Sequence, residues 1–288
     1  MNSMKPPQAV VIASGKGGTG KSTLSLNLSV ALAERGKRVA LLDANLELPS
    51  LATLLNLIPR HTLTDLIEGR CSLGEVIVNG PKGITLILGS SLPNITRNLS
   101  SAHHFGIVNA LNTLSSNVDI LIVDTAPGIN HSTLNFLSAS HDILLIINNE
   151  PTAIACNKAL INQFRGQHRI NNFRIVINKV MNMREGRRAF DTLQREYTEE
   201  FNVFLHYAGH VHAHKHARSA AKNGRTLYEL YPTSEFTKDI KKLAHNIEKW
   251  PSKETPTGRI EFFMDGATNA ASCALPQEGK FLANTPID

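Results

Sequence analysis

Cysteine is scarce in this sequence of 288 residues, which also contains no long apolar run. Cys71, Cys156 and Cys273 lie far apart without metal-ligand spacing, which argues against a disulfide framework or an iron–sulfur site built by one chain. Residues 1–7 carry one lysine and no apolar stretch, so we expect neither a signal peptide nor a membrane span there. Together these absences predict a cytoplasmic protein in a reducing compartment.

The charge balance is basic, with a formal net charge of +6 at pH 7 and an isoelectric point near 9.3. Such an excess suits anionic partners such as nucleotides, DNA or acidic lipid headgroups. No run of five like charges marks a nucleic-acid-binding arm, so a solvated basic surface is the simpler interpretation.

Short apolar runs that end in polar turns recur along the chain and predict buried parallel strands. Stretches with helical periodicity separate most of them, for example Leu24 to Leu32, which Gly36 closes as a C-terminal cap. This alternation predicts an α/β fold, doubly wound, with a mostly parallel sheet and helices on both faces. The runs lie at 9–13, 39–42, 84–88, 120–123, 143–147, 173–177 and 204–207.

A glycine-rich segment between the first predicted strand and helix carries the clearest chemical signal. It reads Gly15-Lys16-Gly17-Gly18-Thr19-Gly20-Lys21-Ser22 and matches the P-loop pattern in its required strand–loop–helix context. The glycines let backbone N–H groups wrap around phosphates, and the helix N-terminus adds positive potential. Lys21 is predicted to reach the β- and γ-phosphates and the Ser22 hydroxyl to bind Mg²⁺. We therefore expect ATP or ADP with Mg²⁺ as cofactors.

Two aspartates close later predicted strands, Asp43 after 39–42 and Asp124 after 120–123. Both should face the phosphates, because ligands of such sheets bind at the carboxyl ends of the strands. Asp124 and Asp43 are predicted to hold Mg²⁺ together with Ser22, partly through water. Gly128 is expected to let the loop after Asp124 respond to the presence of the γ-phosphate. The simpler alternative is that a strand-end aspartate forms a turn or caps a helix.

Lys16 is a second lysine in the loop, and an ordinary phosphate cradle does not need it. With Lys16, the loop resembles the deviant Walker A motif of the MinD/ParA family. This resemblance implies an ATP-dependent homodimer in which Lys16 reaches the phosphates bound by the other copy. A plain surface charge is the alternative.

Further segments resemble the FlhG/FleN branch of this family, the MinD-like regulators of flagellar number and placement. They lie at 62–73, 76–83, 149–152, 177–182 and 185–187, so that the resemblance covers about residues 8–250. It implies a cytoplasmic ATPase that also associates with the inner membrane. The implied partners are the GTPase FlhF, a FleQ-type transcription regulator and flagellar switch-complex proteins.

The predicted site combines the motif and the resemblance. Its catalytic residues are Lys16, Lys21, Asp43, Asn45 and Asp124, and its cofactor-binding residues are Gly15, Lys16, Gly17, Gly18, Thr19, Gly20, Lys21, Ser22, Thr23, Gly128, Glu150, Asn178 and His212.

The sequence departs from the family pattern after the second predicted strand. The family reads Asp-x-Asp there, whereas this chain reads Asp43-Ala44-Asn45. Asparagine cannot accept a proton from water, and loss of a positioned acid or base costs about 10²–10⁴ in rate. We therefore expect an ATPase with tight binding and slow turnover.

The segment expected to line the nucleotide base also departs from the family pattern, because it reads His212-Ala213-His214 where the family has a Pro-x-Asp turn. This replacement leaves the preference for ATP over GTP open. In an extended segment His210, His212, His214 and His216 would share one face and could hold Zn²⁺ or Ni²⁺. An adventitious surface cluster is the favoured interpretation.

Composition changes after a last predicted helix at 234–249. Pro, Thr, Gly, Asn and Ala dominate from position 252, interrupted by Ile260-Glu261-Phe262-Phe263-Met264. The predicted organisation is an extension over 1–7, one ATPase domain over 8–251 and a flexible tail over 252–288. The interruption resembles the start of the family's membrane-targeting segment, but it lacks a sustained apolar face, and the alternative is that its phenylalanines pack on the domain.

Other functions share the P-loop. A ParA-type partition ATPase would bind DNA without sequence specificity, although no DNA-binding arm is recognisable and DNA is not the expected partner. An adaptor locked by ATP and unable to hydrolyse it would explain Asn45. A nitrogenase-type reductase would need thiolates near Asp124, where the sequence has no cysteine.

Overall fold

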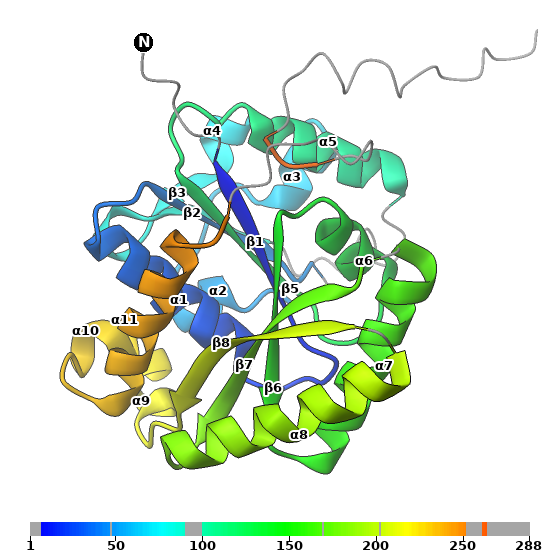
Figure 1. Cartoon of the computed structure of the whole chain (residues 1–288). Helices are drawn as coiled ribbons and strands as arrows, with labels where there is room; N and C mark the ends of the chain where they lie inside the picture. The colour runs from blue at the N-terminus through cyan, green and yellow to red at the C-terminus, as the bar shows by residue number, and fades with distance from the viewer. Residues whose placement is uncertain are drawn as a thin grey trace, which may run out of the picture.

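Eight strands form one sheet in the order β3-β4-β2-β5-β1-β6-β7-β8 (Figure 1). This computed structural model describes residues 7–46, 48–89, 100–168, 170–201, 203–251 and 261–263. All neighbouring strands are parallel except β3, which pairs antiparallel with β4 at one edge. The strands are β1 Gln8–Ala13, β2 Val39–Ala44, β3 Ile77–Asn79, β4 Thr85–Ile87, β5 Ile120–Thr125, β6 Asp142–Asn148, β7 Asn172–Val180 and β8 Phe204–His212.

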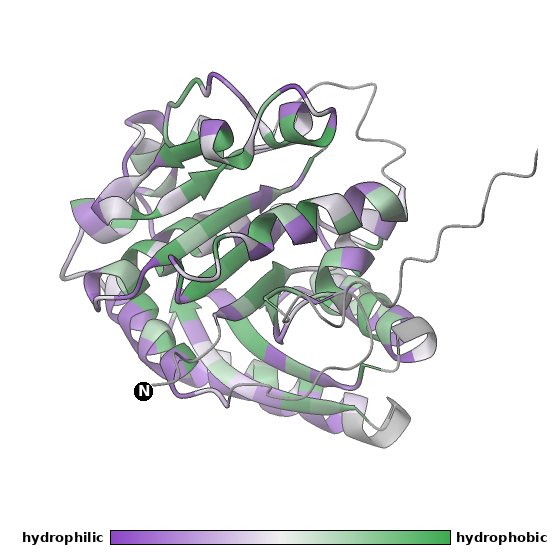
Figure 2. Cartoon of the chain, turned by 90° about the horizontal axis from the view of Figure 1, so that it is seen from above, coloured by the Kyte–Doolittle hydropathy of each residue, from purple (hydrophilic) through white to green (hydrophobic). Residues whose placement is uncertain are grey.

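Helices cover both faces of the sheet because the central strands are apolar on both sides. In β1, Val10 and Ile12 enter one core while Val11 enters the other, and all three are fully buried. Burying each such side chain stabilises the fold by about 1.5–3 kcal/mol. Figure 2 shows these apolar strands enclosed between helices.

The first face carries α1 Lys21–Glu34, α2 Leu51–Leu54, α9 Ala217–Lys222, α10 Leu227–Leu230 and α11 Glu235–Glu248. The second face carries α3 Leu63–Ile67, α4 Leu73–Val76, α5 Ser101–Asn112, α6 His131–Ser138, α7 Pro151–His168 and α8 Met183–Phe201. A short 3₁₀ turn, Pro81–Gly83, precedes β4. The predicted doubly wound sheet with helices on both faces is thus confirmed.

The seven predicted strands are all present, and β3 is an addition that the sequence interpretation missed. Its three residues form an edge strand too short to show a periodic pattern. The predicted cap of α1 is also correct, since Gly36 has φ +84° directly after the helix C-cap. Strands β2 and β5 continue one residue beyond Asp43 and Asp124, so these aspartates lie within the strands.

The apolar pair after the domain, Phe262 and Phe263, packs against α5 and α6. The ring of Phe262 stacks on Phe136 with 6.5 Å between centroids, and its N–H donates to the Ala139 carbonyl at 2.9 Å. The N–H of Phe263 donates to Asn112 Oδ1 at 2.7 Å. Packing on the domain is therefore the correct alternative for this pair. Apart from residues 261–263, the predicted tail lies outside the described residues, as does the predicted extension except for Pro7.

Over the residues that the structure describes, no helix combines the length and the apolar character needed to cross a membrane.

Candidate nucleotide-binding site

The P-loop connects β1 to α1 at the carboxyl edge of the sheet. Gly18 and Gly20 have φ +75° and +93°, a backbone conformation that side chains other than glycine rarely adopt. Inside the loop, Ser14 Oγ donates to the Lys16 carbonyl at 2.8 Å, and Thr19 Oγ1 donates to Ser14 Oγ at 3.0 Å. The loop is thus held in a curved shape by its own side chains.

Three side chains from other elements anchor the loop from outside. Asn157 on α7 accepts a hydrogen bond from the Gly15 N–H at 2.9 Å. At the end of β7, Asn178 Nδ2 donates to the Thr19 carbonyl and Lys179 Nζ donates to the Gly18 carbonyl, both at 2.7 Å. These bonds preorganise the loop, so that binding an anion costs little additional ordering.

Gly15 lies so close to the backbone of α7 that a side chain at this position is expected to destabilise the fold. A Cβ at position 15 would lie 2.3 Å from the carbonyl carbon and oxygen of Cys156, which are rigid backbone atoms. We expect Gly15→Ala to lower the melting temperature by roughly 3–10 °C, because overpacking costs about 1–3 kcal/mol. Differential scanning calorimetry checks this, with Gly106→Ala on α5 as control because its Cβ would meet no atom within 4 Å. Equal melting of both variants contradicts the prediction.

Asp43 and Asp124 are register partners on the adjacent strands β2 and β5, and both are fully buried. Burial and the charge of Asp124 raise the pKa of Asp43 to about 7. Burial also raises the pKa of Asp124, while Lys21 acts in the opposite direction. Lys21 is itself only 7% exposed, and burial lowers its pKa despite the two carboxylates. The site thus concentrates two acids and one base where water is excluded.

Asp124 and Ser22 fit the requirements of Mg²⁺. Asp124 Oδ1 accepts from Ser25 Oγ at 3.0 Å, whereas its buried Oδ2 receives no hydrogen bond of standard geometry from any described residue. A buried carboxylate oxygen without a donor suits a hard cation, which prefers oxygen ligands. The Ser22 hydroxyl lies close enough to lower the pKa of Asp124.

Asp43 has a different local role from Asp124. Its Oδ2 accepts from the N–H groups of Ser50 and Leu51 at 2.9 and 3.0 Å, at the start of α2. Its Oδ1 accepts from the Asn45 N–H at 3.2 Å. Asp43 therefore caps a helix, which is the simpler alternative for a strand-end aspartate, and its role toward Mg²⁺ stays a prediction.

Lys16 lies at the exposed rim of the loop. Its Nζ is 2.9 Å from both Glu150 Oε2 and Thr152 Oγ1. The Lys16 and Glu150 side chains are 38% and 52% exposed, and an ion pair so exposed contributes only about 0–1 kcal/mol. The structure thus brings together two predicted site residues in a contact that another anion could readily replace.

The loops after β2 and β5 both contact the P-loop. Ser50 Oγ donates to Ser22 Oγ at 2.7 Å, and the Gly128 N–H donates to the Ser14 carbonyl at 2.9 Å, with Gly128 at φ +82°. The amide of Asn45 donates to the Leu48 carbonyl at 2.6 Å and so holds its own turn. A change at either loop can therefore reach the P-loop through one hydrogen bond.

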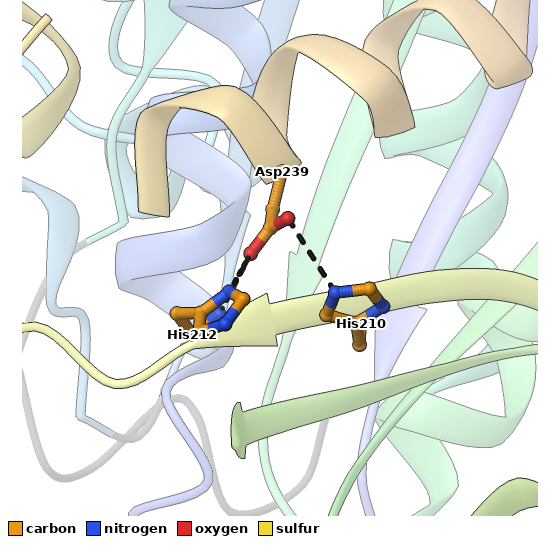
Figure 3. A group of neighbouring side chains, drawn as sticks. All are labelled: His210, His212 and Asp239. Atoms are coloured by element: carbon orange, nitrogen blue, oxygen red, sulfur yellow. Dashed lines mark hydrogen bonds and ion pairs between the residues drawn. The ribbon is translucent and has the colours of Figure 1, made fainter. Parts of the chain in front are cut away.

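The histidine run does not share one face, contrary to the prediction for an extended segment. Strand β8 ends at His212, and the chain then turns. His210 and His212 face Asp239 of α11 (Figure 3), whereas the rings of His214 and His216 pack on Tyr231. The ring of His212 is thus engaged by Asp239, and its predicted contact with a base stays untested.

Sequence interpretation missed several residues that build this site. Asn157, Lys179, Ser25 and Ser50 hold the loop or its acids, yet no role was predicted for any of them. Asn157, Ser25 and Ser50 are single polar residues outside any motif, whereas Lys179 lies in the family-like segment 177–182. Only the fold brings them to the loop, and no periodicity or spacing marks them.

Comparison with known proteins agrees with this geometry. The ParA family model, described as NUBPL iron-transfer P-loop NTPase, matches residues 6–248. The chain is 38% identical to the antiactivator FleN of Pseudomonas aeruginosa over 265 residues, which are 92% of this chain and 95% of FleN. It is 27% identical to the flagellum site-determining protein YlxH of Helicobacter pylori over 259 residues, 89% of this chain and 86% of YlxH.

Solved structures show the same fold. MinD of Aquifex aeolicus superposes with a TM-score of 0.68 at 23% identity, covering 86% of this chain and 100% of that one. MinD of Pyrococcus horikoshii, complexed with Mg-ADP, gives 0.67 at 20% identity, covering 84% and 96%. With its matching family model, its intact P-loop and its FleN-like sequence, this chain belongs to the ParA/MinD family of P-loop NTPases.

Proposed function

We propose that this chain is an ATP-dependent switch of the FlhG/FleN type that regulates the number and placement of flagella. The observation that carries the proposal is the 38% identity to FleN across 95% of that protein. The 27% identity to YlxH, a second flagellar protein, points in the same direction.

The residues of the site support a nucleotide role for the switch. The P-loop N–H groups and Lys21 would hold the phosphates, and Asp124 with Ser22 would hold Mg²⁺, which neutralises phosphate charge when bound. The loops after β2 and β5 contact the P-loop through Ser50 and Gly128, and these contacts support a proposed response of both loops to the γ-phosphate. P. horikoshii MinD, with the same fold, was solved with Mg-ADP.

ATP-dependent dimerisation is the proposed output of the switch. Lys16 would exchange Glu150 and Thr152 for phosphate oxygens bound by a second copy. The exchange is favourable because a weak exposed pair is replaced by a charge-assisted contact that is shielded from water. FlhF, a FleQ-type regulator, flagellar switch-complex proteins and the inner membrane are the partners that we propose from the family resemblance.

Replacing Lys16 tests this output. We expect Lys16→Ala to stay monomeric with saturating ATP and Mg²⁺, because the contact across the dimer is lost, while ATP affinity changes less than about threefold, since Lys21 remains. Light scattering and calorimetry measure the two quantities. Lys238→Ala is the matched control, because it removes a similar exposed pair, with Glu235 at 2.7 Å, on α11. Dimerisation of Lys16→Ala like the natural chain would refute the proposed dimer.

The cellular role is tested in the organism that carries the gene. Deletion should change the number or position of flagella per cell, as counted by electron microscopy. The natural gene should restore the pattern, and Lys21→Ala should not. Unchanged flagella after deletion would refute the flagellar role and leave the nucleotide chemistry untouched.

A further inference from the structure

Two histidines and one aspartate converge where the end of β8 meets α11, and the proposed function does not use this cluster as a unit. His210 and His212 lie near the end of β8, and Asp239 lies on α11 above them (Figure 3). His212 Nδ1 is 2.5 Å from Asp239 Oδ2, and His210 Nε2 is 3.6 Å from Oδ1. One ligand atom from each residue lies within 4.8 Å of the others.

The surroundings fix this geometry. The Tyr207 hydroxyl is 2.9 Å from His210 Nδ1, which leaves Nε2 directed at Asp239. The N–H of His212 donates to Asp239 Oδ2 at 3.0 Å and holds the carboxylate in place. Hydrogen bonds of this kind orient the ligands in protein metal sites.

We propose that His210, His212 and Asp239 bind a divalent transition-metal ion, with Zn²⁺ as the expected occupant. Imidazole nitrogen with one carboxylate oxygen suits Zn²⁺, while Mg²⁺ and Ca²⁺ prefer oxygen alone. With bonds of about 2.0–2.2 Å, tetrahedral Zn²⁺ ligand atoms lie roughly 3.3–3.6 Å apart. The spacing in this cluster needs only small side-chain movements to reach that value. Three protein ligands leave the fourth position open.

Burial distinguishes this cluster from adventitious surface histidines. Asp239 is 3% exposed, and the side chains of His210 and His212 are 11% and 19% exposed. A buried carboxylate that faces two imidazole rings suits a divalent ion, which would supply the compensating positive charge.

The position of the cluster gives the ion a structural consequence. His212 pairs with Val180 of β7, two residues beyond Asn178, which anchors the P-loop. An ion that joins β8 to α11 would fix the strand end next to this anchor. We therefore expect Zn²⁺ to raise the melting temperature of the nucleotide-free protein, by mass action on the folded state.

The test uses the untagged full-length protein, treated with chelator and free of nucleotide. We expect calorimetry to find one tight Zn²⁺ equivalent, and Co²⁺ to give the intense visible absorption of tetrahedral coordination. His210→Gln should weaken Zn²⁺ binding at least about tenfold. His214→Gln is the matched control, because that ring belongs to the same run but packs on Tyr231, and it should bind Zn²⁺ like the natural protein.

Two results would overturn the proposal, namely absence of Zn²⁺ binding by the natural protein and equal affinity in His210→Gln and His214→Gln. Absence of Zn²⁺ binding would mean that the three side chains form only a hydrogen-bonded cluster. Equal affinity of the two variants would mean that Zn²⁺ binds at another place in the protein. If His210→Gln does not fold, zinc-edge X-ray absorption of the natural protein decides the matter. Imidazole scattering supports the site, and its absence overturns it.

Discussion

Lys21→Ala is expected to lower the affinity for ATP with Mg²⁺ about 100-fold, a larger loss than for any other single lysine. Hydrogen bonds to charged groups contribute about 1.5–3 kcal/mol each, and Lys21 is the buried cation beside the predicted phosphate position. Its charge also acts to lower the pKa of Asp124. Without Lys21, Asp124 loses a neighbouring positive charge that favours the carboxylate form, and Mg²⁺ binding is expected to weaken. Calorimetric titration with ATP and Mg²⁺ measures the effect.

Lys37→Ala is the control for this variant. Lys37 is exposed just beyond α1, whereas Lys21 begins that helix. Both variants remove one positive charge from the chain, so a general electrostatic effect would appear in both. The site assignment for Lys21 fails if its variant keeps the natural affinity within about threefold, or if Lys37→Ala loses as much.

The sheet was predictable because its central strands are buried on both faces and therefore read as unbroken apolar runs. The run at 120–123 is an example, since Ile122 and Val123 enter opposite cores and leave no polar position between them. The edge strand β3 lacks this signal, because Ile77 and Val78 are only partly buried and Asn79 is exposed. Strand order also could not be read from the chain, since β1 lies between β5 and β6 through contacts distant in sequence.

The residues of the site likewise fall into those that the sequence predicts and those that it does not. The P-loop is contiguous and has a fixed spacing, so its residues were identified from sequence, and the fold does place Asp43 and Asp124 side by side. The role of Asn157 could not be predicted, because its hydrogen bond to Gly15 joins residues 142 positions apart and depends on how α7 packs. The prediction that the four histidines share one face was wrong for another reason. Alternation predicts one face only while the strand continues, and β8 ends at His212.

Asn45 occupies the position where the resemblance implies a second acid. Its amide donates to the Leu48 carbonyl at 2.6 Å, and its N–H donates to Asp43. The side chain is therefore part of the turn that leads from β2 to Ser50 and the P-loop. An aspartate at this position would lose the bond to Leu48, because a carboxylate cannot donate, but it would gain the ability to accept a proton from water.

Asn45→Asp is accordingly expected to raise the steady-state rate of phosphate release by about 10²–10⁴, the contribution typical of a positioned acid or base. The matched control is Asn56→Asp, because the exposed Asn56 also donates its amide to a backbone carbonyl, that of Lys222 at 3.0 Å, away from the P-loop. Its rate should equal that of the natural chain. The double variant Lys16→Ala with Asn45→Asp should lose the increase in phosphate release, because the proposed dimer is needed to complete the site. Equal and brisk release by the natural chain and Asn45→Asp would show that hydrolysis here does not depend on an acid at position 45.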